Sequence, residues 1–264
     1  MTGPGRAPAR LRMVTWNVRT CRRREGERVD LDLTAATLRS LDADLVALQE
    51  LDRDQERSDR ADQARALGEA LGMRWHYAPA LLGRAENPDG WRPAGADGDR
   101  DPGGPAYGVA LLTRLAAEAV RTVPLPRPRG RGEPRVALLA RVRAGERPLS
   151  VAVTHLSFVP RDAVPQLRWL QRRLAAEPPP RLLLGDLNLW LPIVRLVSLP
   201  GWRPLVRGGT FRNRAPERPL PAVQIDHILA HADDDLRVRR AWIAAGPISD
   251  HRAAVVDLEV AGSG

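Results

Sequence analysis

Short apolar runs recur along the chain and are bounded by polar or turn residues. Leu182-Leu183-Leu184 and Val151-Ala152-Val153 are two of them. Their length and their aliphatic content predict strands that are buried in the protein. We predict strands over residues 11–18, 44–49, 74–80, 107–113, 116–123, 135–142, 149–155, 182–184, 225–230, 236–244 and 252–260.

Helices are predicted between some of these strands. In the segment 161–177 the leucines fall on one side, which is typical of an amphipathic helix, and a run of prolines follows it. Asp30 or Asp32 is expected to cap the first helix. The predicted helices cover residues 31–41, 59–71, 161–177 and 189–199.

The order of these elements predicts an α/β (α+β) protein in which two sheets pack face to face and helices cover them. The 264 residues fit one domain, expected over residues 11–261 after a flexible N-terminus of residues 1–10. Segments 83–105 and 124–134 are rich in Gly, Pro and charged residues and have no apolar period, so we predict surface loops there. For 83–105 we expect either a substrate contact or disorder.

Composition limits the cellular setting. No apolar run is long enough to span a membrane, and the first residues lack the apolar stretch of a secretory signal. We therefore expect a soluble cytoplasmic protein, with a monomer as the default. Cys21 is the only cysteine, which excludes an internal disulfide and a thiolate metal cluster.

The chain is strongly basic, with a formal net charge of +9 and a pI near 11.2. Such a charge favours a polyanionic partner, because phosphates attract positive surfaces. However, all 41 basic side chains are arginine, and Ala, Gly and Pro are also abundant. A compositional bias therefore explains the charge equally well, and the charge only supports a nucleic-acid partner.

Six apolar runs end in polar side chains of the types that carry phosphate chemistry. Hydrolysis of a phosphate ester needs neutralised phosphoryl oxygens, an activated water and a stabilised leaving oxygen. Carboxylates, amides and histidines meet these needs, and Mg²⁺ prefers oxygen ligands. The run ends are Thr15-Trp16-Asn17, Leu48-Gln49-Glu50, Thr154-His155-Leu156, Gly185-Asp186-Leu187-Asn188, Ile225-Asp226-His227 and Ser249-Asp250-His251.

In this order, and with the strand that begins at Tyr107-Gly108, these motifs resemble the endonuclease/exonuclease/phosphatase superfamily. That superfamily is the metal-dependent fold of DNase I-like nucleases, abasic-site endonucleases, sphingomyelinases and inositol polyphosphate phosphatases. The resemblance extends from Thr15 to His251. It implies a four-layer α/β/β/α sandwich with two packed mixed sheets and a site at one end of them.

By this resemblance, Glu50 would bind a divalent cation, Mg²⁺ or alternatively Mn²⁺, with Asn17 beside it and Asp250 as a further ligand. His251 would act as the general base or hold the phosphate, and Asp226 would accept its ring proton. The pairing also has a physical reason, since an imidazole that titrates near neutral pH needs a partner to orient it.

The resemblance further implies that Asp186 aligns or activates the attacking water, that Asn188 bonds a phosphoryl oxygen, and that His155 donates to the phosphate. Tyr107 is a weaker candidate for phosphate contact, because its spacing to the following glycine differs from that in abasic-site enzymes. Arg19 stands where those enzymes carry a second acidic residue, so we expect a less acidic metal environment.

Each of these residues alone has a structural interpretation as well. Asp and Asn after a strand favour turns, and a buried Asp–His pair can be structural. The ordered set of motifs favours the functional interpretation. Three histidines have no role matched to these motifs and are interpreted as structural: His76, His227 and His231.

We predict a metal-dependent phosphoesterase acting on phosphodiester or phosphomonoester bonds, with nucleic acid as the first candidate substrate. The arginine-rich segment around Arg129 would follow a phosphate backbone, and Trp190 would stack on a base, cover lipid or pack against the protein. The alternative substrates are a small phosphate ester, an inositol phosphate or a phospholipid headgroup. The alternative of another class is a catalytically inactive binding scaffold with the same fold.

Overall fold

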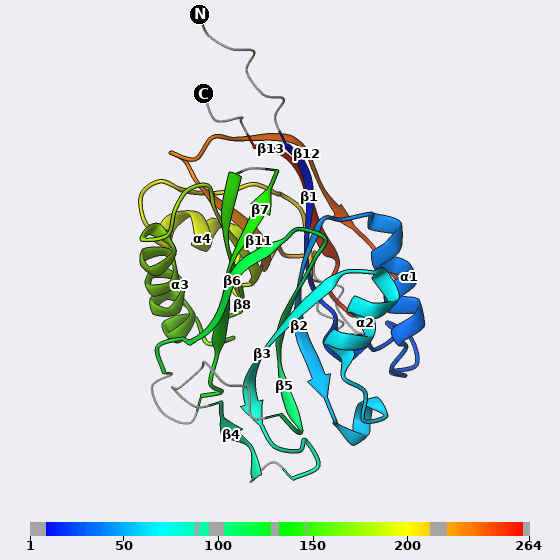
Figure 1. Cartoon of the computed structure of the whole chain (residues 1–264). Coiled ribbons are helices and arrows are strands. Elements are labelled where there is room, and N and C mark those ends of the chain that lie inside the picture. Colours follow the sequence, from blue (N-terminus) through cyan, green and yellow to red (C-terminus); the bar gives the residue numbers. More distant parts are fainter. Residues whose placement is uncertain are drawn as a thin grey trace, which may run out of the picture.

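The computed structural model describes residues 9–87, 90–94, 103–127, 132–145, 147–211 and 221–260. Within these ranges the strands form one sheet of seven strands and one of six, and the two sheets pack face to face with helices outside (Figure 1). The predicted four-layer sandwich is therefore confirmed. None of the described helices has the length and the apolar content needed to cross a membrane.

The seven-stranded sheet contains β1 (Ala9–Asn17), β2 (Leu45–Arg53), β3 (Arg74–Leu82), β4 (Arg92–Pro93), β5 (Ala106–Thr113), β12 (Leu236–Ala244) and β13 (Ala253–Val260). Its spatial order is β12-β13-β1-β2-β5-β3-β4. β1 and β2 are parallel, whereas the other neighbours are antiparallel.

The six-stranded sheet contains β6 (Ala117–Pro124), β7 (Val136–Ala144), β8 (Arg147–His155), β9 (Arg181–Asp186), β10 (Trp202–Pro204) and β11 (Asp226–His231). Its spatial order is β10-β11-β9-β8-β7-β6, with β8 and β9 as the parallel pair. Each sheet thus has one parallel pair whose strands end at the same edge. The edges with the ends of β1 and β9 meet, since these two strands contact each other across the sheets.

Helices α1 (Leu31–Leu41) and α2 (Gln63–Leu71) cover the outside of the first sheet, and α3 (Pro160–Ala175) and α4 (Leu191–Val197) cover the second (Figure 1). Asp30 caps α1 by accepting a hydrogen bond from the backbone N of Leu33, as predicted for this residue type. Two short 3-10 turns, η1 (Arg19–Cys21) and η2 (Glu56–Ser58), follow β1 and β2.

Alternation along the strands divides the apolar residues among three clusters. Residues of one parity, such as Met13 on β1 and Leu184 on β9, form the core between the sheets. Residues of the other parity, such as Trp16 and Leu183, pack beneath the helices. Because successive strand residues point to opposite faces, both faces of each sheet are apolar.

Some boundaries differ from the predictions. The helix expected over 59–71 starts only at Gln63, because Asp62 caps it and Asp59 and Arg60 have left-handed backbone. The segment 83–105, expected to be a loop, contributes the short strand β4, while 88–89 and 95–102 lie outside the described residues. Strand β10 was not expected. The first strand begins at Ala9, inside the terminus expected to be flexible, and residues 1–8 lie outside the description.

Candidate active site

Strand alternation delivers most of the predicted polar residues to one place. On β1, Met13 faces the other sheet, so Asn17 faces the same way at the end of the strand. On β9, Leu184 lies in the same core, and Asp186 follows it on the same face. The residues that this alternation brings to the end of the inter-sheet core are Asn17, His155, Asp186 and Asp226.

Glu50 reaches this place only because β2 is irregular. By strict alternation it would face the helices together with Leu48. The pairing register of β2 shifts between Gln49 and Leu51, and Glu50 has a left-handed φ of 62°. Such a bulge inserts one residue and redirects its side chain, so the carboxylate points towards Asn17 instead.

Hydrogen bonds from Asn17 connect the two sheets at this point. Its Nδ2 donates to Oε1 of Glu50 at 2.8 Å and to Oδ2 of Asp186 at 3.0 Å. Its Oδ1 accepts from the backbone N of Arg19 at 3.0 Å. Asn17 therefore holds a carboxylate of one sheet next to a carboxylate of the other.

His251 and Asp226 form the oriented pair that was predicted. The ring Nδ1 of His251 lies 2.8 Å from Oδ2 of Asp226, and its Nε2 lies 3.9 Å from Oδ2 of Asp186. Burial lowers the pKa of His251, but the charges of Asp226, Asp186 and Asp250 outweigh it and raise the pKa to about 10. The imidazolium form of His251 is thus favoured.

Asp186 lies at the centre of the cluster. Burial and the charge of Asp226 raise the pKa of Asp186 to about 7. Its Oδ1 accepts from the backbone N of Asn188 at 2.9 Å, which fixes the turn after β9. A carboxylate that titrates near neutral pH is suited to exchange a proton with water.

His155 and Asn188 face each other beside Asp186. The Nδ2 of Asn188 donates to the backbone O of Leu156 at 3.0 Å and lies 3.1 Å from Nε2 of His155. Burial, and next the charge of Arg135, keep the pKa of His155 well below its usual range. His155 is therefore neutral, with Nε2 as the acceptor of the Asn188 amide.

The remaining predicted residues lie at the rim. Asp250 is half-buried and close enough to raise the pKa of both Arg19 and His251 by its charge. Tyr107 lines a cavity of about 600 Å³ that also includes Glu50. Trp190 is exposed. Arg129 lies outside the described residues.

Three residues that belong to none of the motifs surround Tyr107 and enlarge the site: Arg57, Trp91 and Arg135. Trp91 packs edge-on against the ring of Tyr107, and the guanidinium of Arg57 lies 5.6 Å from that ring. Arg135, only 6% exposed, lines a small pocket with Tyr107 and His155 and pairs with Glu133 at 3.3 Å. The sequence signal for Arg135 was its place at the start of the predicted strand 135–142, whereas the motif residues stand at strand ends.

The donor set fits a hard divalent cation. Carboxylate oxygens of Asp186 and Asp226 lie within 4.8 Å of each other and of a ring nitrogen of His251, which as an imidazolium offers no ligand atom to a cation. Oδ1 of Asp226 is buried and has no hydrogen-bond partner among the described residues. With Glu50 and Asn17 adjoining, the cluster is rich in the oxygen ligands that Mg²⁺ and Mn²⁺ prefer.

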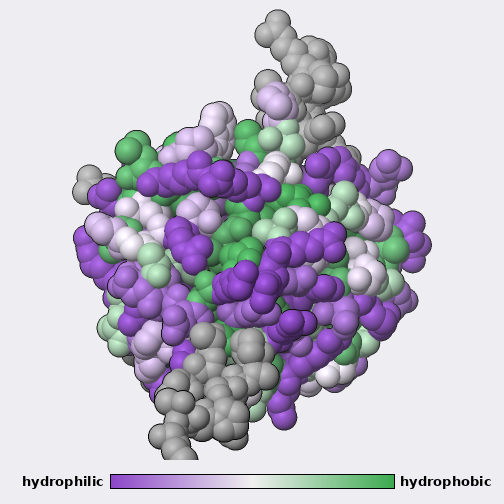
Figure 2. Space-filling model, turned by 90° about the horizontal axis from the view of Figure 1, so that it is seen from above, coloured by the Kyte–Doolittle hydropathy of each residue, from purple (hydrophilic) through white to green (hydrophobic). Residues whose placement is uncertain are grey.

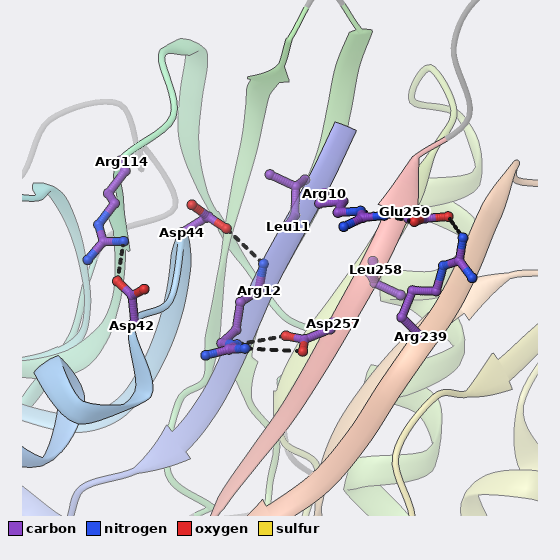
Figure 3. Close-up of a pocket in the computed structure, with 10 residues that line it drawn as sticks. All are labelled: Arg10, Leu11, Arg12, Asp42, Asp44, Arg114, Arg239, Asp257, Leu258 and Glu259. Atoms are coloured by element: carbon purple, nitrogen blue, oxygen red, sulfur yellow. Dashed lines mark hydrogen bonds and ion pairs between the residues drawn. The ribbon is translucent and has the colours of Figure 1, made fainter. Parts of the chain in front are cut away.

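A second cavity, of about 520 Å³, lies at the opposite end of the molecule (Figures 2 and 3). Its four arginines face four carboxylates: Arg10 and Arg239 pair with Glu259, Arg12 with Asp257, and Arg114 with Asp42, while Asp44 accepts from the backbone N of Arg12. Because the charges balance, this cavity offers no net attraction to an anion or a cation. The chemistry is concentrated at the end with Asp186.

Solved structures share this fold. An endonuclease/exonuclease/phosphatase from Beutenbergia cavernae DSM 12333 has a TM-score of 0.72 and 24% identity, over 96% of this chain and 72% of that one. TDP2 of D. rerio, in complex with a single-strand DNA product, has a TM-score of 0.66 and 18% identity over 94% and 98%. ANGEL2, a 2',3'-cyclic phosphatase, has a TM-score of 0.65 and 15% identity over 96% of both chains.

A comparison with curated proteins found no match. The sequence nevertheless matches the model of the Endonuclease/Exonuclease/phosphatase family over residues 14–251. That range contains the whole cluster from Asn17 to His251. The match spans most of the chain and agrees with the four-layer fold, and the chain therefore belongs to the endonuclease/exonuclease/phosphatase family.

Proposed function

We propose that this protein is a divalent-metal-dependent phosphoesterase that hydrolyses phosphodiester or phosphomonoester bonds by in-line attack of water. The observation that carries the proposal is the cluster of the half-buried Glu50 with four buried residues, Asn17, Asp186, Asp226 and His251, which four strands and the loop before β13 bring together. Membership of a family named for nucleases and phosphatases supports the same reaction class.

Glu50, with Asn17 and Asp250 beside it, would hold Mg²⁺ or Mn²⁺. The bound cation would neutralise charge on the phosphoryl oxygens. Asn17 holds the carboxylates of Glu50 and Asp186 next to each other by donating a hydrogen bond to each. A loss of this amide would therefore release both carboxylates at once.

His251 and Asp186 would share the proton chemistry. Asp226 fixes the orientation of the His251 ring, so that its Nε2 lies on the side of Asp186. Because the imidazolium form is favoured, His251 is better suited to donate to a phosphoryl oxygen than to accept a proton. That leaves Asp186 as the group that orients the attacking water and accepts its proton.

Asn188 and His155 would bind the other phosphoryl oxygens. The turn after β9 holds Asn188, and the Asn188 amide contacts the ring of His155 at the end of β8, so that their polar atoms converge beside Asp186. Arg135 adds a buried positive charge on the side of His155. A fixed guanidinium in a buried site stabilises the negative charge that builds up in the transition state.

Nucleic acid is the first candidate substrate. The cavity beside Glu50 is lined by Trp91 and Tyr107, aromatic rings of the kind on which nucleotide bases stack, and by three arginines, Arg19, Arg22 and Arg57, which face three glutamates, Glu27, Glu50 and Glu133. The D. rerio TDP2 complex contains a single-strand DNA product. A steep fall of activity with added salt would support a polyanionic substrate, whereas salt-insensitive hydrolysis of a small phosphate ester would contradict it.

The central test compares Asp186→Ala and His251→Ala with Asp257→Ala, a control at the opposite end of the molecule. Hydrolysis of a panel of phosphodiesters and phosphomonoesters with Mg²⁺, and with chelator, is measured for each. The first two variants should lose activity while their thermal unfolding stays cooperative, and Asp257→Ala should keep it. Near-normal activity in either active-site variant would refute the assignment. Absence of Mg²⁺ and Mn²⁺ binding in calorimetry would favour an inactive scaffold.

A further inference from the structure

Two aromatic side chains project into solvent from the loops that carry the site. Phe158 is 67% exposed and follows His155 in the loop after β8, and Trp190 is 57% exposed and follows Asn188 in the loop after β9. Large aromatic side chains gain most from burial, so two such rings left in water at one rim require an explanation.

The loops after β8 and β9 begin next to each other. In the parallel pair of β8 and β9, His155 lies opposite Asp186. The backbone N of Leu156 donates to the O of Asp186 at 2.9 Å, and the side chain of Asn188 donates back to the O of Leu156. Because these bonds tie the loops together directly beside the site, both aromatic residues lie at the same edge of it.

The backbone that presents Trp190 is firmly held. Nε2 of the buried His227 donates to the carbonyl O of Leu189 at 2.9 Å. The carbonyl O of Trp190 itself accepts from the backbone N of Val194 in the first turn of α4. The exposed indole therefore stands on a fixed support, which reduces the entropy lost when a ligand packs against it.

Behind the aromatic residues lies a positive surface. Helices α3 and α4 are adjacent, since Nε of Arg168 donates to the O of Val197 at 2.8 Å (Figure 1). Of the arginines on these two helices, Arg173 pairs with Glu177 at 3.7 Å, and the others form no ion pair with a described carboxylate; Asp162, the one acidic residue in these two helices, is buried. The exposed arginines without an ion pair to a described carboxylate are Arg161, Arg168, Arg172 and Arg195.

We propose that Phe158 and Trp190 stack on bases of a single-stranded nucleic acid that flank the phosphate in the site, and that the arginines of α3 and α4 contact phosphates further along the strand. The proposal rests on the phosphoesterase function proposed above and names its substrate. Single strands are favoured because their base faces are free to stack, whereas those of a duplex are already stacked.

A lipid surface is the main competing partner for exposed aromatic and basic residues. Membrane docking needs a continuous apolar face that enters the bilayer. On this side of the described structure, Leu196 is the only large aliphatic side chain that is exposed, at 83%, and it sits next to Arg195. Stacking, in contrast, needs only the two rings. Substitution of Leu196 should therefore weaken binding to a membrane but not to a nucleic acid.

The test measures binding by fluorescence anisotropy for the full chain in EDTA, which prevents cleavage. The probes are a labelled single-stranded oligothymidylate and an abasic oligomer of the same length, which keeps the phosphates but has no bases. Trp190→Ala and Phe158→Ala should each weaken oligothymidylate binding by about tenfold and leave abasic binding unchanged. Trp190→Phe should restore most of the affinity, and Leu196→Ala should change neither.

The exposed arginines of α3 and α4 are tested by the salt dependence of binding. Arg161→Ala combined with Arg195→Ala should weaken both oligomers and reduce the salt dependence of binding by roughly one unit of log–log slope for each arginine–phosphate pair that the substitutions remove. Circular dichroism of each variant confirms its folding. Because binding is measured without metal, failure of hydrolysis would refute the proposed phosphoesterase while leaving the stacking result intact.

Three results would overturn the proposal. The first is unchanged oligothymidylate binding in Trp190→Ala and Phe158→Ala, and the second is an equal weakening of abasic-oligomer binding in these variants. The third is loss of binding to vesicles of anionic phospholipid in both Trp190→Ala and Leu196→Ala, with oligothymidylate binding unaltered. That result would assign the surface to a membrane.

Discussion

Replacing His227 with glutamine should make the protein less sensitive to acid. His227 is fully buried; its Nε2 donates to the O of Leu189, and its Nδ1 lies 3.3 Å from the amide Nε2 of Gln224, which donates to it. Both ring nitrogens are thus satisfied only in the neutral form. Burial lowers the pKa of His227 from 6.5 to about 4.

The sign of the effect follows from proton binding. Below pH 6.5 the unfolded chain protonates this histidine, whereas the folded chain keeps it neutral down to about pH 4. The free energy of unfolding therefore falls as the pH drops through this window and is unaffected above it. At about 1.4 kcal/mol per pH unit, His227 costs roughly 2 kcal/mol near pH 5 and about 3 kcal/mol at its limit.

Urea unfolding of the natural protein and of His227→Gln, near pH 7.5 and near pH 5, measures the effect. Glutamine can donate to Leu189 and accept from Gln224 but does not titrate. The groups that titrate in both proteins cancel in the difference. The variant should gain roughly 2 kcal/mol relative to the natural protein on going to the lower pH. Equal losses of stability in both proteins would refute the reasoning that His227 stays neutral when folded.

Three more outcomes are expected from other parts of the structure. Asp226→Asn removes the carboxylate that orients His251, so kcat should fall by about 10² to 10⁴ with little change in KM or thermal stability; steady-state kinetics with an unchanged kcat would contradict the assigned role. Arg57→Leu leaves the fully buried carboxylate of Asp52 without its two hydrogen bonds, and urea unfolding should show a loss of about 3 kcal/mol; a change within error would show that Asp52 finds another partner. Burial raises the pKa of Cys21 to about 12, so a disulfide reagent should label it only after unfolding, and rapid labelling of the native protein would contradict its burial.

The sequence predicted the elements of the core well because their apolar patterns are local. The strand over 236–244 has the predicted bounds, and Asp30 caps α1 as one of two proposed residues. The second helix was less predictable, since its start depends on the cap at Asp62 and on the left-handed residues before it. Strand β10 is short and pairs only with β11, so its pattern gives little signal.

The site shows the same division. The polar strand ends could be identified from motif order, and alternation accounts for how Asn17 and Asp186 come together. The bulge that redirects Glu50 is a feature of pairing between β2 and β5, which the sequence of β2 alone does not contain. The burial of Arg135 beside His155 results from contacts between segments that are distant in the sequence. Its position before an apolar run does not predict that burial.

The left-handed backbone at Glu50 has a consequence for attempts to make this protein more robust. A residue with a Cβ in that conformation costs roughly 1 kcal/mol, whereas glycine adopts it without steric cost. Selection for heat tolerance alone would thus be drawn to a glycine at this position and would discard the carboxylate. At this position, thermal stability and catalytic activity thus favour different residues, so substitutions meant to stabilise the protein should be made away from the active site.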